Sequence, residues 1–219
     1  MLKAVIFDMD GVIIDSEPLH YKAYHRMFKD VDINVSSELY ESFTGQSTLN
    51  VCKRLCDTFN LKEAPETLVK IKRKHHKHIF ENDDDLQLIP GVLEAIKDYH
   101  ANGLKLVLAS SASMVSIELI FKRFELDQYF SAKFSGADLK QSKPHPEIFI
   151  KAAQSTGFNN EECVVIEDST NGIKAANAAG IFCVGYDSLH STNQDYSTAN
   201  FVVNSFDDIS FEKLREVLG

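Results

Sequence analysis

Short apolar runs rich in β-branched residues alternate along the chain with amphipathic stretches, and turn residues separate the two. Runs of this length and composition predict buried strands. The predicted strands are 4–7, 105–109, 132–135, 163–166, 181–185 and 201–203. Residues 91–100, 145–156 and 171–179 have helical patterns that glycines close, as is common at helix ends. The alternation predicts an α/β fold, with a Rossmann-like, mostly parallel sheet and helices on both faces.

Residues 16–83 interrupt this alternation, because they contain helical patterns and no convincing strand. Ser16 and Pro18 are typical of a helix start. Apolar residues then recur at helical spacing: Leu19, Ala23, Met27, Val51, Cys52, Leu55, Cys56 and Phe59. We therefore expect a small α-helical cap domain at 16–83, inserted into an α/β core formed by 1–15 and 84–219.

The composition is that of an ordinary globular protein, with 219 residues, 44% hydrophobic and 25% charged. The net charge of −9 argues against nucleic acid and anionic membranes as partners. No apolar stretch approaches the roughly 20 residues of a membrane span, and the first apolar run is too short for a signal peptide. The four cysteines form no CxxC pair and lie in apolar segments, which indicates reduced core thiols and a cytoplasmic protein.

In open parallel sheets, ligands bind beyond the carboxyl ends of the strands. Several residues suited to ligand binding follow the predicted strands at these ends. They are Asp8, Asp10, Gly11, Ser110, Ser111, Ser113, Glu167, Asp168 and Ser169, with Lys143 just before the helix at 145–156. Carboxylates, hydroxyls and one ammonium group from four regions of the chain can together hold a hard cation and a phosphoryl group.

Each residue type has a chemical reason to be there. Asp8 and Asp168 supply the oxygen ligands that Mg²⁺ prefers, and the cation offsets repulsion between an anionic nucleophile and a phosphate. Lys143 offers a positive charge and Ser110 a hydroxyl donor to phosphate oxygens. Asp10 can act as general acid and then as general base. Taken singly, these residues also fit a turn, a helix cap and a surface lysine, but their joint occurrence at successive strand ends favours catalysis.

Four segments carry a family resemblance: DMDGV (8–12), LASSAS (108–113), KPHPEIF (143–149) and VIEDSTNGIKAANAAG (165–180). In order and spacing they resemble the four motifs of the haloacid dehalogenase-like hydrolase superfamily. Within it, the chain resembles the β-phosphoglucomutase-like phosphatase branch, and the resemblance covers nearly the whole chain.

The resemblance implies that Asp8 is the nucleophile that forms an aspartyl-phosphate and that Asp10 is the general acid and base. It implies Mg²⁺ as cofactor. The expected metal ligands are Asp8, Asp10 through its carbonyl, Glu167 and Asp168. The expected phosphate-binding residues are Ser110, Ser111 and Lys143.

The cap should set specificity and close over the site. His20 matches a substrate-side histidine of the β-phosphoglucomutases, although a half-exposed helix histidine is the alternative. The substrate-specificity loop corresponds to Gly45, Gln46 and Ser47, and Thr48 or a neighbour replaces the arginine of the mutases. Lys74 lies near the position of a mutase cap lysine. The basic run 70–78 is otherwise expected to be a solvated helix face, and its histidines lack the spacing of a helical zinc pair.

Three functions remain open on the sequence. The leading hypothesis is a Mg²⁺-dependent phosphatase of small phosphate monoesters such as sugar phosphates. The alternatives are a β-phosphoglucomutase that interconverts β-glucose 1-phosphate and glucose 6-phosphate, and a non-catalytic sugar-phosphate-binding protein. In each case we expect a monomer that binds a small phosphorylated metabolite, without nucleic acid or membrane partners.

Overall fold

The computed structural model describes residues 1–43, 48–82, 86–188 and 193–218. Contacts divide the chain into two compact units, one formed by Met1–Asp15 with Gln87–Gly219 and the other by Ser16–Leu86. The predicted boundaries were after residues 15 and 83. We call the first unit the core unit and the second the cap unit.

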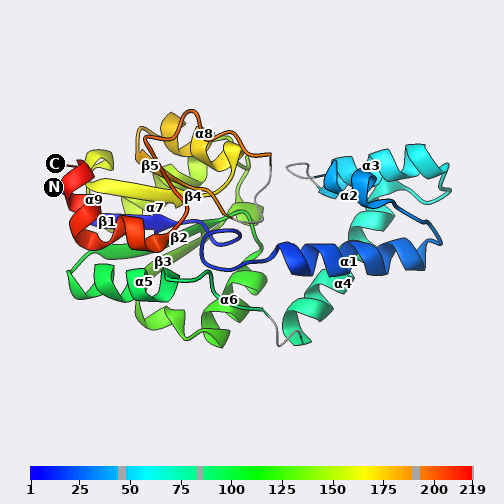
Figure 1. The fold of residues 1–219 in the computed structure, drawn as a ribbon, viewed down its shortest axis with the longest axis horizontal. Coiled ribbons are helices and arrows are strands. Elements are labelled where there is room, and N and C mark those ends of the chain that lie inside the picture. Colours follow the sequence, from blue (N-terminus) through cyan, green and yellow to red (C-terminus); the bar gives the residue numbers. More distant parts are fainter. Residues whose placement is uncertain (44–47, 83–85, 189–192, 219) are drawn as a thin grey trace. The chain divides into compact units, whose positions relative to one another are not determined.

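The core unit is built on a sheet of six parallel strands (Figure 1). The strands are β1 (Ala4–Phe7), β2 (Lys105–Ser110), β3 (Phe130–Ser135), β4 (Cys163–Glu167), β5 (Phe182–Tyr186) and β6 (Phe201–Val203). Their spatial order is β3-β2-β1-β4-β5-β6, so the chain builds outward from β1 on one side and from β4 on the other. The predicted α/β class and all six predicted strands are confirmed. The direction of winding reverses between β1 and β4, which is where such sheets bind ligands.

Helices cover both faces of this sheet, as the continuous apolar strands require. The helices of the core unit are α5 (Val92–Ala101), α6 (Met114–Arg123), α7 (Glu147–Thr156), α8 (Thr170–Ala178) and α9 (Phe211–Leu218). Short 3₁₀ turns lie at Leu126–Gln128, Gly136–Asp138, Asn160–Glu162 and Phe206–Ile209. In Figure 1, α7 and α8 lie on one side of the sheet, and α5 and α6 lie on the other.

Alternate residues of the central strands face the two helical layers. Ala4 and Ile6 of β1 belong to the cluster that α7 and α8 cover, together with Phe149 and Ile173. Phe7 faces the opposite layer, where its ring lies 6.1 Å from that of Tyr99 in α5. All four residues of β1 are buried, so this strand is the centre of the core and a rigid base for the residue that follows it.

The segment after β1 makes a tight loop. Gly11 adopts a positive φ of 77°, which glycine tolerates without strain, and its amide donates to the Ile14 carbonyl at 2.8 Å. Ile14 also forms an antiparallel bridge with Leu88. The two connections between the units therefore lie side by side where they leave and re-enter the core unit.

The described part of the cap unit consists of four helices: α1 (Glu17–Asp30), α2 (Ser37–Glu41), α3 (Thr48–Phe59) and α4 (Pro65–Asn82). Their apolar faces share one cluster, which includes Tyr24, Met27, Val51, Leu55 and Leu68. Tyr24 is thus a packing residue of the cap unit. The cap has its own small core, separate from that of the sheet.

All four cysteines are free thiols, and Cys52, Cys163 and Cys183 are buried. Among the residues that the structure describes, no helix has the length and hydropathy needed to cross a membrane.

Candidate active site

Three neighbouring strands run in parallel register to the carboxyl end of the sheet. Phe7 pairs with Leu108 of β2 and with Ile166 of β4. The next residue along each strand is Asp8, Ala109 and Glu167, respectively. The amide of Asp8 still donates to the Ile166 carbonyl at 3.0 Å, so the sheet itself positions the backbone of this aspartate.

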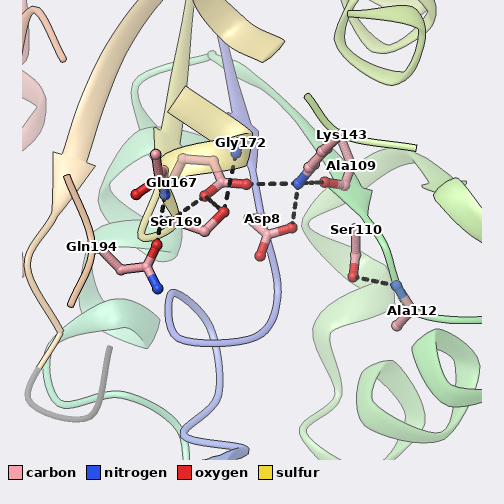
Figure 2. A network of polar contacts seen from close by, with 10 residues as sticks. Asp8, Ala109, Ser110, Ala112, Lys143, Glu167, Ser169, Gly172 and Gln194 are labelled. Carbon is pink, nitrogen blue, oxygen red and sulfur yellow. Dashed lines mark hydrogen bonds and ion pairs between the residues drawn. The ribbon is translucent and has the colours of Figure 1, made fainter. Parts of the chain in front are cut away.

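Lys143 joins these strand ends through its ammonium group (Figure 2). Its Nζ donates to Asp8 Oδ1 at 2.7 Å, to Glu167 Oε1 at 2.8 Å and to the Ala109 carbonyl at 2.9 Å. An ammonium group has three N–H donors, so these acceptors use all of them. The nitrogen also lies 4.8 Å from the centre of the Phe149 ring. The primary contacts of this lysine are therefore with the carboxylates of the site.

The ion pairs are buried, which makes them strong and also makes the group sensitive to unbalanced charge. The side chains of Lys143, Asp8 and Glu167 expose only 6%, 9% and 1% of their surface. Burial raises the pKa of Asp8 to about 7; Lys143 opposes this rise, and the charges of Glu167 and Asp10 add to it. Burial alone would lower the pKa of Lys143, but the charges of Asp8 and Glu167 outweigh it and raise the pKa.

Glu167 is fixed by the turn that follows it. Its Oε2 accepts from the Ser169 amide at 2.7 Å and from the Ser169 hydroxyl at 2.9 Å, and Ser169 Oγ accepts from the Gly172 amide at 3.1 Å. A Cβ atom at position 172 would lie 1.6 Å from Glu167 Oε1. Only glycine therefore allows the first turn of α8 to approach this carboxylate.

A third carboxylate completes an acidic cluster. Asp8, Glu167 and Asp168 are all buried. Each has a carboxylate oxygen that lies within 4.8 Å of a carboxylate oxygen of the other two. When ionised, three carboxylates against the single ammonium of Lys143 leave an excess of two negative charges. Hard oxygen donors with this excess suit a divalent cation such as Mg²⁺. Asp10, half-buried in the loop after β1, contributes to the electrostatic field at Asp8.

The loop that follows β2 packs against the residues at the end of β3. Ser110 is fully buried, and its Oγ accepts from the Ala112 amide at 3.1 Å. Ser135, at the end of β3, donates its hydroxyl to the Ala112 carbonyl at 2.8 Å. A Cβ atom on Gly136 would lie 3.2 Å from the Ser111 Cα, so this position also backs the loop closely. The side chain of Ser111 itself is exposed.

In the cap unit, His20 forms a cluster with two residues of α4. Lys72 Nζ lies 2.7 Å from His20 Nδ1, and the His20 and His76 rings are 4.5 Å apart. A protonated lysine has no acceptor, so the hydrogen bond assigns His20 as the neutral tautomer with its proton on Nε2. Burial and then the charge of Lys72 lower the pKa of His20 well below its usual value and that of His76 to about 4.

This cluster corrects the expectation that residues 70–78 form a solvated face. Lys72 is 3% exposed, whereas Lys74 is exposed to solvent. Lys72 lies four residues after the buried Leu68 and four before His76, so it belongs to the inward stripe of α4. The predicted loop residues Gly45, Gln46 and Ser47 lie outside the described residues.

The structure thus brings Asp8, Lys143, Glu167 and Asp168 together, and it adds residues that the sequence analysis did not identify. Ser169 was noted only as a polar residue, and Gly172 and Lys72 were given no role. A glycine two residues into a helical pattern and a lysine within an apolar stripe are the signals that could have found the latter two.

Comparisons with known proteins identify the family of this chain. The family model of the haloacid dehalogenase-like hydrolases matches residues 5–186. A phosphorylated carbohydrates phosphatase of Thermotoga maritima is 32% identical over 192 residues, which cover 88% of each chain. Hexitol phosphatase B of Escherichia coli K12 is 31% identical over 80% of this chain and 79% of its own. The crystal structure of β-phosphoglucomutase from Clostridium difficile is 29% identical, with a TM-score of 0.78, covering 100% of this chain and 97% of its own.

Proposed function

Because this chain belongs to the haloacid dehalogenase-like hydrolases and is an enzyme of phosphoric monoesters, we propose that it is a Mg²⁺-dependent sugar-phosphate phosphatase. The observation that carries the proposal is the buried group at the β1–β4 switch point. There Lys143 binds Asp8 and Glu167, and Asp168 completes an acidic cluster. The sugar phosphates acted on by the similar phosphatases support the substrate class.

The proposed metal ligands are the carboxylates of Asp8, Glu167 and Asp168, with the carbonyl of Asp10. When bound, Mg²⁺ supplies positive charge that attracts the phosphate and reduces its repulsion by the nucleophile. It also favours ionised carboxylates, which opposes the effect of burial on Asp8.

The chain's own residues perform the covalent steps. Lys143 holds one oxygen of Asp8, so the carboxylate is oriented before the substrate arrives. The carboxylate attacks phosphorus, the ester P–O bond breaks, and Asp10 protonates the leaving alcohol. Asp10 then accepts a proton from water as the water attacks the aspartyl-phosphate, which releases inorganic phosphate and restores Asp8.

The phosphate is held by the loop after β2. The Ser110 oxygen accepts from Ala112, and a hydroxyl that accepts one hydrogen bond can still donate its own hydrogen, here to a phosphate oxygen. Ser111 can reach the same group through its backbone or hydroxyl. Lys143 contributes mainly through its charge, because its three donors already have partners.

A cap contribution follows from the His20 tautomer. With Nδ1 accepting from Lys72, His20 presents Nε2–H as a donor for a substrate hydroxyl or phosphate. Lys74, Gly45, Gln46 and Ser47 remain part of the proposed cap side of the site.

A phosphomutase is the second candidate, because the similarity to β-phosphoglucomutase extends over the whole chain. Against it, Thr48 or a neighbour replaces the arginine that the resemblance would require for a second phosphate. In the phosphatase, water accepts the phosphoryl group; in the mutase, a sugar hydroxyl does.

The test is a panel of hexose, pentose and hexitol phosphates incubated with the purified protein, with Mg²⁺ or with EDTA. We expect Mg²⁺-dependent release of phosphate from at least one sugar phosphate. A second assay supplies β-glucose 1-phosphate with a trace of the bisphosphate and compares glucose 6-phosphate with free phosphate. Dominant isomerisation would replace the phosphatase by the mutase, and no turnover of any compound would overturn both.

A further inference from the structure

The segment 193–200, which leads from β5 to β6, is anchored firmly on the sheet. The Asn200 amide donates to the Cys183 carbonyl at 2.9 Å, and the Cys183 amide donates back to Asn200 Oδ1 at 2.8 Å. Tyr196 donates its hydroxyl to the Tyr186 carbonyl at 3.3 Å. A Cβ atom on Gly185 would lie 3.0 Å from the Tyr196 ring, so the segment packs directly on β5. These contacts fix the backbone that carries Gln194 and Asp195, which are among the first residues of the segment.

Those first residues hold the start of α8. The side-chain Oε1 of Gln194, labelled in Figure 2, accepts a hydrogen bond from the Thr170 amide at 2.8 Å. In return, the Thr170 hydroxyl oxygen accepts from the Asp195 amide at 2.7 Å. This reciprocal pair of bonds, which we call the Gln194 clamp, joins two segments separated by 24 residues.

The clamp acts on the turn that carries two of the proposed metal ligands. Thr170 lies two residues after Asp168 and directly after Ser169, which binds Glu167. The turn is thus held internally by Ser169 and from outside by Gln194. Tyr196 of the same segment is close enough to Asp168 for that charge to add to the rise in the pKa of Tyr196, which burial mainly causes.

We infer that Gln194 is a positioning residue for the divalent-cation site, because it fixes the backbone at Thr170 and thereby the direction of Asp168. The inference rests on the proposed function. Mg²⁺ and Mn²⁺ require well-placed oxygen ligands, and loss of a residue that orients a ligand typically lowers metal affinity 10- to 100-fold. The inferred role of Gln194 is therefore indirect, through the backbone at Thr170.

The test measures Mn²⁺ binding to the substrate-free protein, by the electron paramagnetic resonance signal of free Mn²⁺. We expect Gln194→Ala to raise the dissociation constant about 10-fold. The matched control is Asn177→Ala, because Asn177 Nδ2 donates to the Thr198 carbonyl at 2.8 Å and joins the same segment to the same helix, far from the carboxylates in sequence. We expect the control to change the constant less than about 2-fold.

A second pair of variants tests the other half of the clamp. Thr170→Val keeps the shape but removes the acceptor for Asp195, whereas Thr170→Ser keeps the hydroxyl. We expect weaker Mn²⁺ binding for Thr170→Val and parental binding for Thr170→Ser, with circular dichroism showing that all variants are folded.

Parental Mn²⁺ affinity in both Gln194→Ala and Thr170→Val would overturn the inference alone and leave the cation site intact. Equal weakening by Gln194→Ala and Asn177→Ala would also overturn it, because the segment would then be only a structural tether. Absence of Mn²⁺ binding by the parent protein would overturn both the inference and the proposed cofactor.

Discussion

Two buried lysines, one in each unit of the chain, have opposite surroundings. Lys143 of the core unit donates to two carboxylates, Asp8 and Glu167, which expose 9% and 1% of their side chains. Lys72 of the cap unit lies 2.7 Å from a neutral histidine nitrogen and 5.0 Å from the centre of the Tyr24 ring. Lys143 therefore offsets the negative charge of two carboxylates, whereas Lys72 places a positive charge beside a neutral imidazole.

The difference shows how one residue type produces two electrostatic results. The carboxylates raise the pKa of Lys143, and its charge in turn opposes protonation of Asp8. Lys72 lowers the pKa of His20, in addition to the larger effect of burial. The charge of Lys143 thus favours the ionised carboxylate that the proposed mechanism needs at Asp8, and the charge of Lys72 favours a neutral His20.

Among tests of the contrast between Lys143 and Lys72, Asp8→Asn should have the largest effect. It removes a carboxylate partner of Lys143 while preserving the side-chain shape. We expect turnover to be abolished with an unchanged circular dichroism spectrum, because the proposed nucleophile and one metal ligand are lost together. Turnover is measured as the release of phosphate from p-nitrophenyl phosphate in the presence of Mg²⁺. The control is Asp208→Asn, whose side chain is 53% exposed, and it should retain parental activity. Activity of Asp8→Asn within a few-fold of the parent would exclude Asp8 as nucleophile.

Asp10→Asn tests a core carboxylate that the proposal uses for proton transfer instead. The substitution keeps the main-chain carbonyl, so its expected effect is a rate reduction of roughly 10²–10⁴, the usual range for general acid and base catalysis. A sugar phosphate, with a poor leaving group, should lose more rate than p-nitrophenyl phosphate. Unchanged rates with both substrates would contradict the assignment.

Lys143→Met and Lys133→Met separate buried from exposed ion pairs within the core unit. Lys133 also contacts two carboxylates, Glu118 at 2.9 Å and Asp127 at 2.6 Å, but their side chains are 53% and 57% exposed. We expect Lys143→Met to lower the free energy of unfolding by about 3–5 kcal/mol, because it leaves buried carboxylates without their cation. Lys133→Met should lower it by less than about 1 kcal/mol.

Urea denaturation of both variants, followed by circular dichroism, measures this difference. The loss in Lys143→Met should diminish when Mg²⁺ is added, since the cation can replace part of the missing charge. Equal losses in the two variants would show that burial at the site does not strengthen the pairs.

The smallest expected effect concerns the cap unit. Lys72→Met should raise the pKa of His20, because the positive charge disfavours a second proton on the ring, although burial and the neighbouring His76 still hold the pKa down. Titration of the imidazole protons by nuclear magnetic resonance measures it. Lys74→Met is the matched control, since Lys74 is an exposed lysine two residues along the same helix, and it should leave the titration unchanged. An identical His20 titration in the parent and in Lys72→Met would remove the assigned role of Lys72.

Much of the fold was predictable because its strands are short and apolar on both faces. The first and last strands were predicted with the bounds that the structure has, and β3 begins two residues earlier than its apolar pattern indicated. The helices α6 and α9 are not among the predicted ones; no glycine stop follows α6, whereas Gly219 follows α9 in the sequence. Apolar periodicity reports local burial well and element boundaries less well.

The sequence by itself determined the class of the fold, the helical insertion and the residues that end the central strands, because period and composition are local properties of the chain. Only the tertiary structure decided which acceptors receive the protons of Lys143, since it lies 135 residues from Asp8. The same holds for Lys72 and His20, which are 52 residues apart, and for the Gln194 clamp. Partners this distant are selected by packing, so no local pattern records them, and the electrostatics of the site follow from packing as well.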